Sequence, residues 1–292
     1  MKFEDMLLCP LCKAPLAAEG RSLYCLGERR HCYDVASSGY VNLLPPGKKS
    51  NAKTGDDKEM LRSRRAFLSG GYYDEISKTA AEAALSALCD TAGEVRSLSF
   101  VDAGCGDGYH ALNIEKYYKE QGIECTPIGL EASKYGAECA SKLAGRAGSN
   151  AFFAAANIFA MPLRDKSCDI AFSMFAPVPD EEAMRVLKDD GVLLVCSSGS
   201  RHLWEMREVI YDEPRVSPPL SRVPEGFVLR GHQSLSYSFT LESPEAIAAL
   251  FTMTPFYYRC PREGRERLLS LSSLTVSAET EYNVYVKADN VK

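Results

Sequence analysis

The sequence contains no run of about 18 apolar residues, so no transmembrane helix and no membrane partner are expected. Residues 1–10 also lack the apolar core of a secretory signal, which leads us to expect a cytoplasmic protein. Basic residues are fewer than acidic ones: the sequence has 34 Lys and Arg and 39 Asp and Glu, which gives a formal net charge of −5. That balance weighs weakly against a nucleic-acid partner, since phosphate binding favours a basic surface.

Basic charge is nevertheless concentrated in two places. Residues 46–68 hold seven Lys and Arg against three Asp and Glu, and the segment includes Lys48, Lys49 and Lys53. A second group of arginines lies within residues 259–267. Solvated helix faces and a linker explain such clusters as well as phosphate contacts do, so both interpretations stay open.

Three zones divide the chain. Residues 1–45 are rich in cysteine and turn residues, residues 46–75 form a polar, basic connector, and from residue 76 to 292 helical and apolar strand patterns alternate. The alternation predicts an α/β fold whose parallel sheet is covered on both faces. The expected strands are 97–104, 125–133, 150–156, 167–175 and 191–198, followed by antiparallel strands at 227–241 and 281–287. The expected helices are 74–90, 109–121, 133–144, 180–188 and 243–252, and the proline-rich segment 211–226 reads as a loop or flap.

A glycine loop follows the first strand of this pattern. The string Val-Asp-Ala-Gly-Cys-Gly-Asp-Gly occupies residues 101–108, and its glycines allow a tight turn and a close approach of the backbone to a ligand. Asp102 stands two positions before the first glycine, as in enzymes that use S-adenosylmethionine (AdoMet). Glu131 ends the next strand, where its carboxylate could accept hydrogen bonds from both hydroxyls of a ribose. The expected loop contacts are Asp102, Gly104, Gly106, Gly108 and Tyr109.

A dinucleotide-binding loop is the main rival interpretation. Its G-x-G-x-x-G spacing places a pyrophosphate at a helix N-terminus. Here the third glycine comes one residue early, and Asp107 would repel a pyrophosphate. AdoMet has no phosphate and carries an ammonium group, so the pattern favours AdoMet over NAD and over a turn without a ligand.

Two later strand ends are typical positions for further contacts with AdoMet. Asn157 and Ile158 follow the third strand and could bracket the adenine, and Phe175 ends the fourth strand next to the transferable methyl. Enzymes that methylate exocyclic amines commonly have Asn/Asp-Pro-Pro-Tyr/Phe there, whereas this chain has Phe-Ala-Pro-Val at residues 175–178. The difference speaks against an exocyclic amine as the acceptor.

The first 32 residues contain a cysteine cluster with metal-ligand spacing. Cys9 and Cys12 form a C-x2-C knuckle, Cys25 follows, and His31 and Cys32 are adjacent. Structural zinc sites take four Cys or His ligands in tetrahedral geometry, so three cysteines and either His31 or Cys32 complete a set. A redox C-x-x-C is the alternative, but it normally lies in a thioredoxin-like βαβ context. A segment of 45 residues buries little apolar surface, so the metal would supply much of its stability.

These two halves together resemble one family, the RlmA type of 23S rRNA (guanine-N1)-methyltransferases. The resemblance rests on strings spread along the chain: Cys-Pro-Leu-Cys at 9–12, His-Cys-Tyr-Asp at 31–34, Gly-Tyr-Val-Asn-Leu-Leu-Pro at 39–45, Arg-Arg-Ala-Phe-Leu at 64–68, Asp-Ala-Gly-Cys-Gly at 102–106, Phe-Ala-Pro at 175–177, Arg-His-Leu at 201–203, Ile-Tyr at 210–211 and Met-Thr-Pro-Phe at 253–256. It implies a Rossmann-like class I methyltransferase with a mostly parallel seven-stranded sheet, preceded by a small N-terminal zinc ribbon.

The resemblance also implies AdoMet as cofactor, one structural Zn²⁺, and methyl transfer to N1 of a guanine in a 23S rRNA hairpin. It implies that the ribbon helps to grip RNA and that the enzyme is a homodimer, and it gives no reason to expect DNA. Five residues separate Cys25 from His31, where the family usually has three. His31 keeps register with the downstream Tyr-Asp pair, which favours it over Cys32 as the fourth ligand.

The catalytic base is the least defined part of the site. N1 of guanine carries a proton near neutral pH, so a proton must leave, and His202 follows the fifth strand at the catalytic edge of the sheet. A role in positioning the flap explains His202 equally well. Phe175, Tyr109, Trp204 and Tyr211 are candidates for stacking on a base. Two other functions stay open: a small-molecule methyltransferase, and a catalytically silent protein of this fold that binds RNA.

Overall fold

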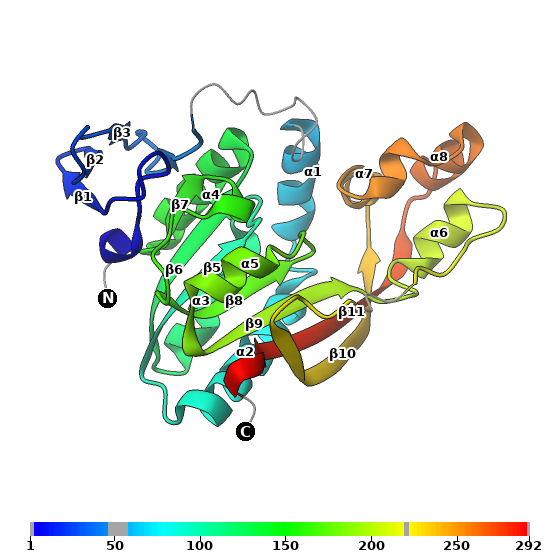
Figure 1. Ribbon diagram of the computed structural model, residues 1–292. Helices are drawn as coiled ribbons and strands as arrows, with labels where there is room; N and C mark the ends of the chain where they lie inside the picture. The colour runs from blue at the N-terminus through cyan, green and yellow to red at the C-terminus, as the bar shows by residue number, and fades with distance from the viewer. Residues whose placement is uncertain (1–2, 46–57, 219–221, 291–292) are drawn as a thin grey trace.

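The computed structural model describes residues 3–45, 58–218 and 222–290. Its main element is a sheet of eight strands in the order β10-β11-β9-β8-β5-β6-β7-β4 (Figure 1). The strands from β9 to β4 in that order are parallel to their neighbours, and β11 is antiparallel to both β9 and β10. Their bounds are β4 Val41–Asn42, β5 Ser97–Ala103, β6 Glu124–Glu131, β7 Phe152–Ala155, β8 Cys168–Met174, β9 Leu187–Ser198, β10 Phe227–Leu241 and β11 Leu274–Lys287.

The predicted class I methyltransferase architecture is confirmed, with one strand more than expected. The additional strand is β4, which comes from the cysteine-rich zone and pairs Val41 with Ala154 and Asn42 with Ala155 of β7. A strand of two residues has no alternation that a sequence pattern could reveal. The N-terminal module is thus joined to the large sheet by backbone hydrogen bonding as well as by the connector.

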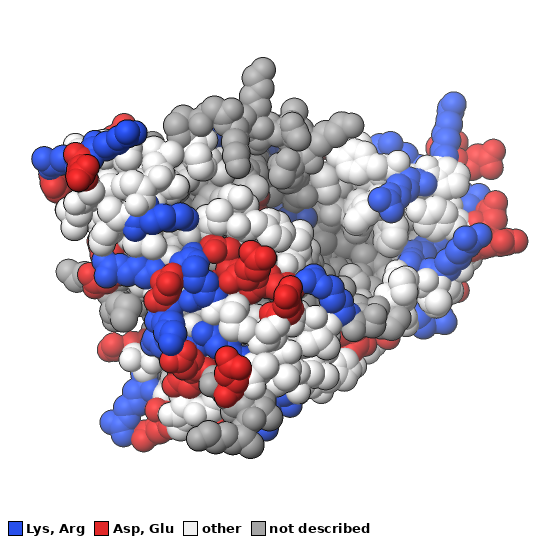
Figure 2. Space-filling model, in the orientation of Figure 1, with Lys and Arg blue, Asp and Glu red and all other residues white. Residues whose placement is uncertain are grey.

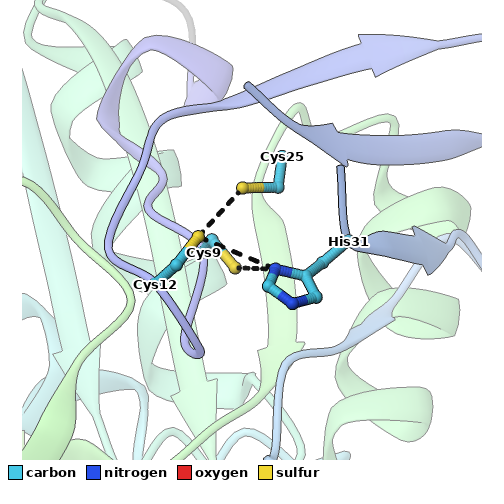
Figure 3. A group of neighbouring side chains, drawn as sticks. All are labelled: Cys9, Cys12, Cys25 and His31. Atoms are coloured by element: carbon cyan, nitrogen blue, oxygen red, sulfur yellow. Dashed lines mark hydrogen bonds between the residues drawn. The ribbon is translucent and has the colours of Figure 1, made fainter. Parts of the chain in front are cut away.

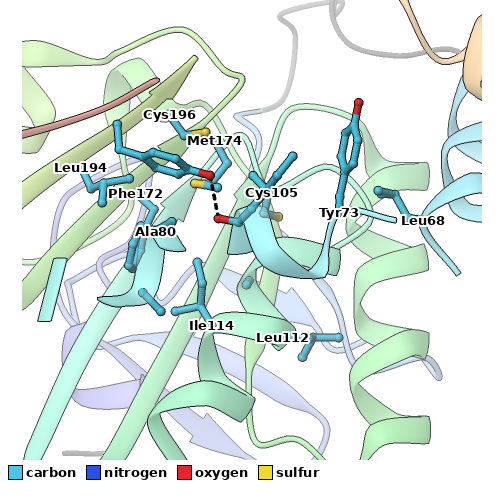
Figure 4. Packing of buried hydrophobic residues seen from close by; sticks show 14 of the residues in the cluster. Leu68, Tyr73, Ala80, Cys105, Leu112, Ile114, Phe172, Met174, Leu194 and Cys196 are labelled. Carbon is cyan, nitrogen blue, oxygen red and sulfur yellow. Dashed lines mark hydrogen bonds between the residues drawn. The ribbon is translucent and has the colours of Figure 1, made fainter. Parts of the chain in front are cut away.

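Helices α2 (Asp74–Ala92), α3 (Tyr109–Glu120) and α4 (Lys134–Ala147) contribute to one face of the sheet, with the end of α1 (Lys58–Leu68). Their apolar side chains interlock with sheet residues such as Phe172 and Leu194, which Figure 4 shows beside Ala80 and Ile114. Full burial of large side chains on this scale is the main source of stability in such a domain. This packing holds the glycine loop between β5 and α3 in place.

The N-terminal module and α5 (Asp180–Val186) both pack against the other face of the sheet (Figure 1). Strands β1 (Leu16–Glu19), β2 (Ser22–Cys25) and β3 (Cys32–Asp34) form a small antiparallel sheet, and η1 (Phe3–Met6) precedes it. Phe3 stacks on Phe152 of β7 with ring centroids 4.5 Å apart. Apolar residues of the module share one buried cluster with the sheet and with α5 (Asp180–Val186). The module is therefore packed into the core of the larger domain.

A helical lobe extends from the opposite side of the molecule (Figure 1). It consists of α6 (Trp204–Ile210), α7 (Pro244–Thr252), η3 (Pro255–Tyr258) and α8 (Arg262–Leu269). The expected flap leaves α6 and contains neither helix nor strand up to β10 in its described residues, 211–218 and 222–226. Short 3-10 turns complete the chain, η2 at Ile158–Ala160 and η4 at Ala288–Asn290. Within the described ranges, no helix combines the length and apolar character needed to cross a bilayer.

Candidate functional site

The glycine loop turns sharply from β5 into α3. Gly104 and Gly108 have φ angles of +86° and +82°, in the left-handed region that side chains disfavour. Space is also short, because a Cβ added at Gly108 would lie 2.8 Å from the Cβ of Ala140. A Cβ at Gly104 would lie 2.9 Å from the Cβ of Ala176. The loop can follow this path only with glycine at these positions.

Glu131 lies beside this loop, at the end of β6. One carboxylate oxygen accepts the N–H of Gly106 at 3.0 Å, and the other accepts the N–H of Ser133 at 2.8 Å. Each oxygen can accept a second hydrogen bond. The carboxylate is thus held in a fixed orientation, as a contact to a ribose requires, and the structure brings Glu131 and the loop together as predicted.

Asp102 has an unusual environment at the end of β5. The residue is fully buried, and neither carboxylate oxygen has a hydrogen-bond partner among the described residues. Burial, with a smaller contribution from the charge of Glu131, raises the pKa of the Asp102 carboxyl to about 7. A buried acceptor without a partner is costly, which is the usual sign of a group that completes its bonds with a ligand.

Phe175 directly follows β8 in a strained conformation with a φ of +54°. The residue is 39% exposed, and the centroid of its ring lies 6.4 Å from the ring centroid of Tyr73, 5.9 Å from that of His110 and 6.1 Å from that of His202. Strain at a non-glycine residue persists only where the surroundings enforce it, and it is common at functional sites. The exposed ring, set among three other rings, offers a surface on which a flat base could stack.

His202 is held on both sides of its ring. Nδ1 lies 3.1 Å from the backbone nitrogen of Glu279 and 2.9 Å from its carbonyl oxygen, and Nε2 lies 3.1 Å from the hydroxyl oxygen of Tyr73. Burial lowers the pKa of His202 to about 4, so the ring is neutral at pH 7. Both ring nitrogens therefore already have partners in the protein.

The remaining predicted contacts lie around the carboxyl edge of the sheet. Asn157 is exposed and caps η2, accepting the N–H of Phe159 at 3.0 Å, and Ile158 is almost fully buried. Tyr109 begins α3, and its hydroxyl donates to Asp74 at 2.5 Å, so this group is directed towards α2.

Three cysteines and one histidine meet in the N-terminal module (Figure 3). The Sγ atoms of Cys9, Cys12 and Cys25 and a ring nitrogen of His31 all lie within 4.8 Å of one another. Nδ1 of His31 lies 3.4 Å from Sγ of Cys9 and 3.6 Å from Sγ of Cys12. Three thiols and one imidazole gathered around a common centre form the donor set that tetrahedral zinc prefers.

The surroundings of this cluster suit thiolate ligands. Burial raises the pKa of the Cys9 thiol, but hydrogen bonds from the Tyr33 hydroxyl and from the backbone outweigh it and lower the pKa to about 6. Burial raises the pKa of the Cys25 thiol, and the N–H of Gly27, which donates to its Sγ at 3.3 Å, opposes that effect. Cys32 lies outside the cluster and makes a long contact, 3.8 Å, with Asp34.

Comparison with known proteins gives the family. A zinc-ribbon family described as "RlmA, N-terminal" matches residues 7–52, and one described as "Methyltransferase domain" matches residues 94–227. A Streptomyces fradiae protein named 23S rRNA (guanine(748)-N(1))-methyltransferase is 31% identical over 278 residues, 92% of this chain and 91% of its own. This chain belongs to the 23S rRNA (guanine-N1)-methyltransferase family. YxjB of Bacillus subtilis, which carries a provisional name in the same family, is 29% identical over 97% of this chain and 98% of its own. A relative from Micromonospora griseorubida is 33% identical over 68% of both chains.

The methyltransferase therefore uses AdoMet and carries a zinc ribbon. Its residues fit both groups. The unpartnered oxygens of Asp102 suit an ammonium group, Glu131 suits a ribose, and the glycines leave room for close approach. The predicted zinc ligands form one cluster.

Sequence reasoning missed two side chains at this site, Tyr73 and Arg64. Tyr73 lies at the start of α2 and contacts both His202 and Phe175. Arg64 lies on α1, and its Nη1 would be 3.2 Å from a Cβ added at Gly106. Both come from segments before the first strand of the large domain, where no spacing relative to the glycine loop could indicate them. The Arg-Arg-Ala-Phe-Leu string was the only sequence feature that included Arg64. It indicated the family but not that Arg64 lies beside the glycine loop.

Proposed function

We propose that this enzyme transfers a methyl group from AdoMet to N1 of a guanine in a hairpin of 23S rRNA. The observation that carries the proposal is the likeness to relatives with that named activity over more than nine-tenths of the chain, zinc ribbon included. The site supports it, because acidic and glycine contacts for AdoMet lie next to an exposed aromatic ring.

The bound cofactor supplies an electrophilic methyl on a sulfonium, so the protein has to align the acceptor nitrogen with it. Phe175 is placed to stack on the target base, and its strained backbone fixes the ring at the end of β8. N1 of guanine is engaged in a Watson–Crick pair in duplex RNA, so the base must be unpaired or turned out of the stack. An unpaired hairpin base meets that requirement.

His202 and Tyr73 act together in this proposal. A neutral His202 is able to accept a proton, but its lone pair already receives a hydrogen bond from the protein. We assign His202 to holding the Tyr73 hydroxyl beside Phe175, where that hydroxyl can contact the base or the cofactor. A role as general base would require His202 to give up one of these partners during the reaction.

RNA contacts are proposed at two arginines that stack on aromatic rings. The guanidinium of Arg201 lies 4.2 Å from the ring centroid of Trp204, and that of Arg30 lies 4.8 Å from the ring centroid of Tyr24. Arg30 also pairs with Glu19 in solvent, an interaction that contributes little to stability. Lys and Arg project from both the ribbon and the helical lobe (Figure 2). The predicted contacts Lys48, Lys49 and Lys53 lie outside the described residues.

Three further expectations belong to this proposal. Residues 1–45 act as the RNA-recognition module, residues 46–75 as the basic connector, and residues 76–292 as the catalytic domain. The enzyme works in the cytoplasm, where rRNA is made, with no role for DNA. The homodimer implied by the family resemblance is tested by sedimentation equilibrium of the zinc-loaded protein.

The test is methyl transfer from labelled AdoMet to unmodified 23S rRNA, free or in ribosomal particles, followed by digestion and mass identification of the nucleoside. The proposal expects 1-methylguanosine, and mapping the modified nucleotide then shows whether it is the guanine 748 of the Streptomyces fradiae relative's name. A different methylated nucleoside would refute the acceptor. AdoMet binding without transfer to any RNA would favour a small-molecule acceptor or a silent RNA-binding protein.

A further inference from the structure

The acidic side chains around the glycine loop match only part of the charge that AdoMet carries. Asp102, Asp107 and Glu131 place three carboxyl groups at the loop, and all three are at least nine-tenths buried. AdoMet brings an ammonium group and a sulfonium, which suit these acids, but also a carboxylate, which they repel. A cation at this point would bind the carboxylate and offset any charge that the acids carry.

Arg64 supplies a positive charge at this place. It lies on α1, one turn before Phe67 and Leu68, whose buried side chains fix that end of the helix against the core. Its Nη1 would be 3.2 Å from a Cβ added at Gly106, so the guanidinium rests on the middle glycine of the loop. A side chain at Gly106 would crowd the guanidinium at this distance.

The electrostatic influence of Arg64 reaches several groups in the site. Burial raises the pKa of Asp107, and the charge of Arg64 is the largest opposing influence. Burial and then the charge of Arg64 lower the pKa of His110 to about 3. The guanidinium therefore lies close enough to the loop and to His110 to influence both.

We propose that Arg64 binds the carboxylate of the cofactor's methionine group, so that α1 forms one wall of the AdoMet site. A guanidinium offers two parallel N–H donors that match a carboxylate, and such pairs are strong where they are shielded from water. This inference rests on the AdoMet site described above and is independent of the RNA acceptor.

The experiment compares two ligands that differ only at the carboxylate. S-adenosylhomocysteine has it, and S-adenosyl-3-thiopropylamine, its decarboxylated analogue, lacks it while keeping the amine. Binding of each is measured by titration calorimetry to the zinc-loaded, full-length protein and to Arg64→Gln and Arg64→Lys. The matched control is Arg62→Gln, which removes the same charge from an exposed position on the same helix.

Loss of a charged hydrogen-bonding partner is expected to weaken binding of S-adenosylhomocysteine to Arg64→Gln by about 10- to 100-fold. The affinity of Arg64→Gln for the decarboxylated analogue should change less than about twofold. The affinity of Arg64→Lys for S-adenosylhomocysteine should lie between those of Arg64→Gln and the unaltered protein, and Arg62→Gln should bind both ligands as the unaltered protein does. Equal weakening of both ligands, or of neither, would overturn the assignment. Failure of the unaltered protein to bind S-adenosylhomocysteine would instead refute the AdoMet site itself. Thermal unfolding of each unliganded variant separates a folding defect from a binding defect.

Discussion

The buried carboxyl of Asp102 should make both the stability of the protein and its binding of AdoMet depend on pH. Its pKa rises from the usual 3.8 to about 7, because burial and the neighbouring Glu131 disfavour the charged form. The folded protein without ligand therefore binds a proton here that the unfolded chain has already released between pH 4 and 7. By linkage, this contribution to stability is present in full below about pH 4 and is lost as the pH rises through 7.

The size of the effect follows from the difference between the two pKa values. It corresponds to about 4 kcal/mol between pH 4 and pH 8, as an order of magnitude. Asp102→Asn cannot ionise, so its free energy of unfolding should increase relative to the unaltered protein across this range and level off above pH 7. The ammonium group of AdoMet would favour the charged form of Asp102 over the protonated form. Cofactor binding near pH 6 should therefore release about one proton from Asp102.

Urea unfolding between pH 4.5 and 8.5 measures the first effect, as a difference curve between Asp102→Asn and the unaltered protein. Calorimetry of AdoMet binding at pH 6 in two buffers with different ionisation enthalpies measures the proton release. The control is Glu124→Gln, which removes an exposed carboxyl at the start of β6. Parallel pH curves for Asp102→Asn and the unaltered protein, together with no release of a proton, would refute this account of Asp102.

Three further predictions concern other parts of the site. Cys12→Ser should lose the bound zinc, whereas Cys32→Ser should keep one Zn²⁺ per chain, as measured by atomic absorption; loss of metal in both would implicate Cys32. Gly108→Ala should lower the free energy of unfolding by about 2 to 4 kcal/mol, because of its positive φ and the short approach to Ala140, and an unchanged urea midpoint would contradict this. Burial lowers the pKa of His202 to about 4, so single-turnover rates of methyl transfer should show no inflection from this residue between pH 6 and 7. An inflection there that disappears in His202→Asn would restore His202 as a base titrating near 6.5.

The parts of the site that sequence could predict are those fixed by local geometry. A loop between a strand and a helix needs glycine where φ is positive, so the turn at Gly104 and Gly108 could be predicted from the sequence. The carboxyl ends of adjacent parallel strands meet at one edge, which placed Glu131 beside that loop. The spacing of Cys9, Cys12, Cys25 and His31 likewise reflects how many residues a small ribbon needs to bring four ligands together.

The parts that could not be predicted depend on contacts between distant segments. Tyr73 and His202 are 129 residues apart, and nothing in either neighbourhood indicates that they meet. The approach of Arg64 to Gly106 depends on how α1 packs, and the polar, basic character predicted for residues 46–75 does not specify that packing. The packing of ribbon residues such as Leu7 and Leu43 against one face of the sheet could not be predicted for the same reason.

The pairing of β4 with β7 has a consequence for the metal-free protein. β4 is the edge of the large sheet, and it is held there by the ribbon, with Leu43 donating to the carbonyl of Ala155 at 2.8 Å. If loss of zinc unfolds the ribbon, the backbone of β7 and the apolar sheet face beneath it become exposed. An uncovered strand edge next to an apolar surface invites association between chains. We therefore expect the zinc-free protein to aggregate while its glycine loop is still folded. The metal would then keep the methyltransferase domain soluble, although its ligands all belong to the ribbon.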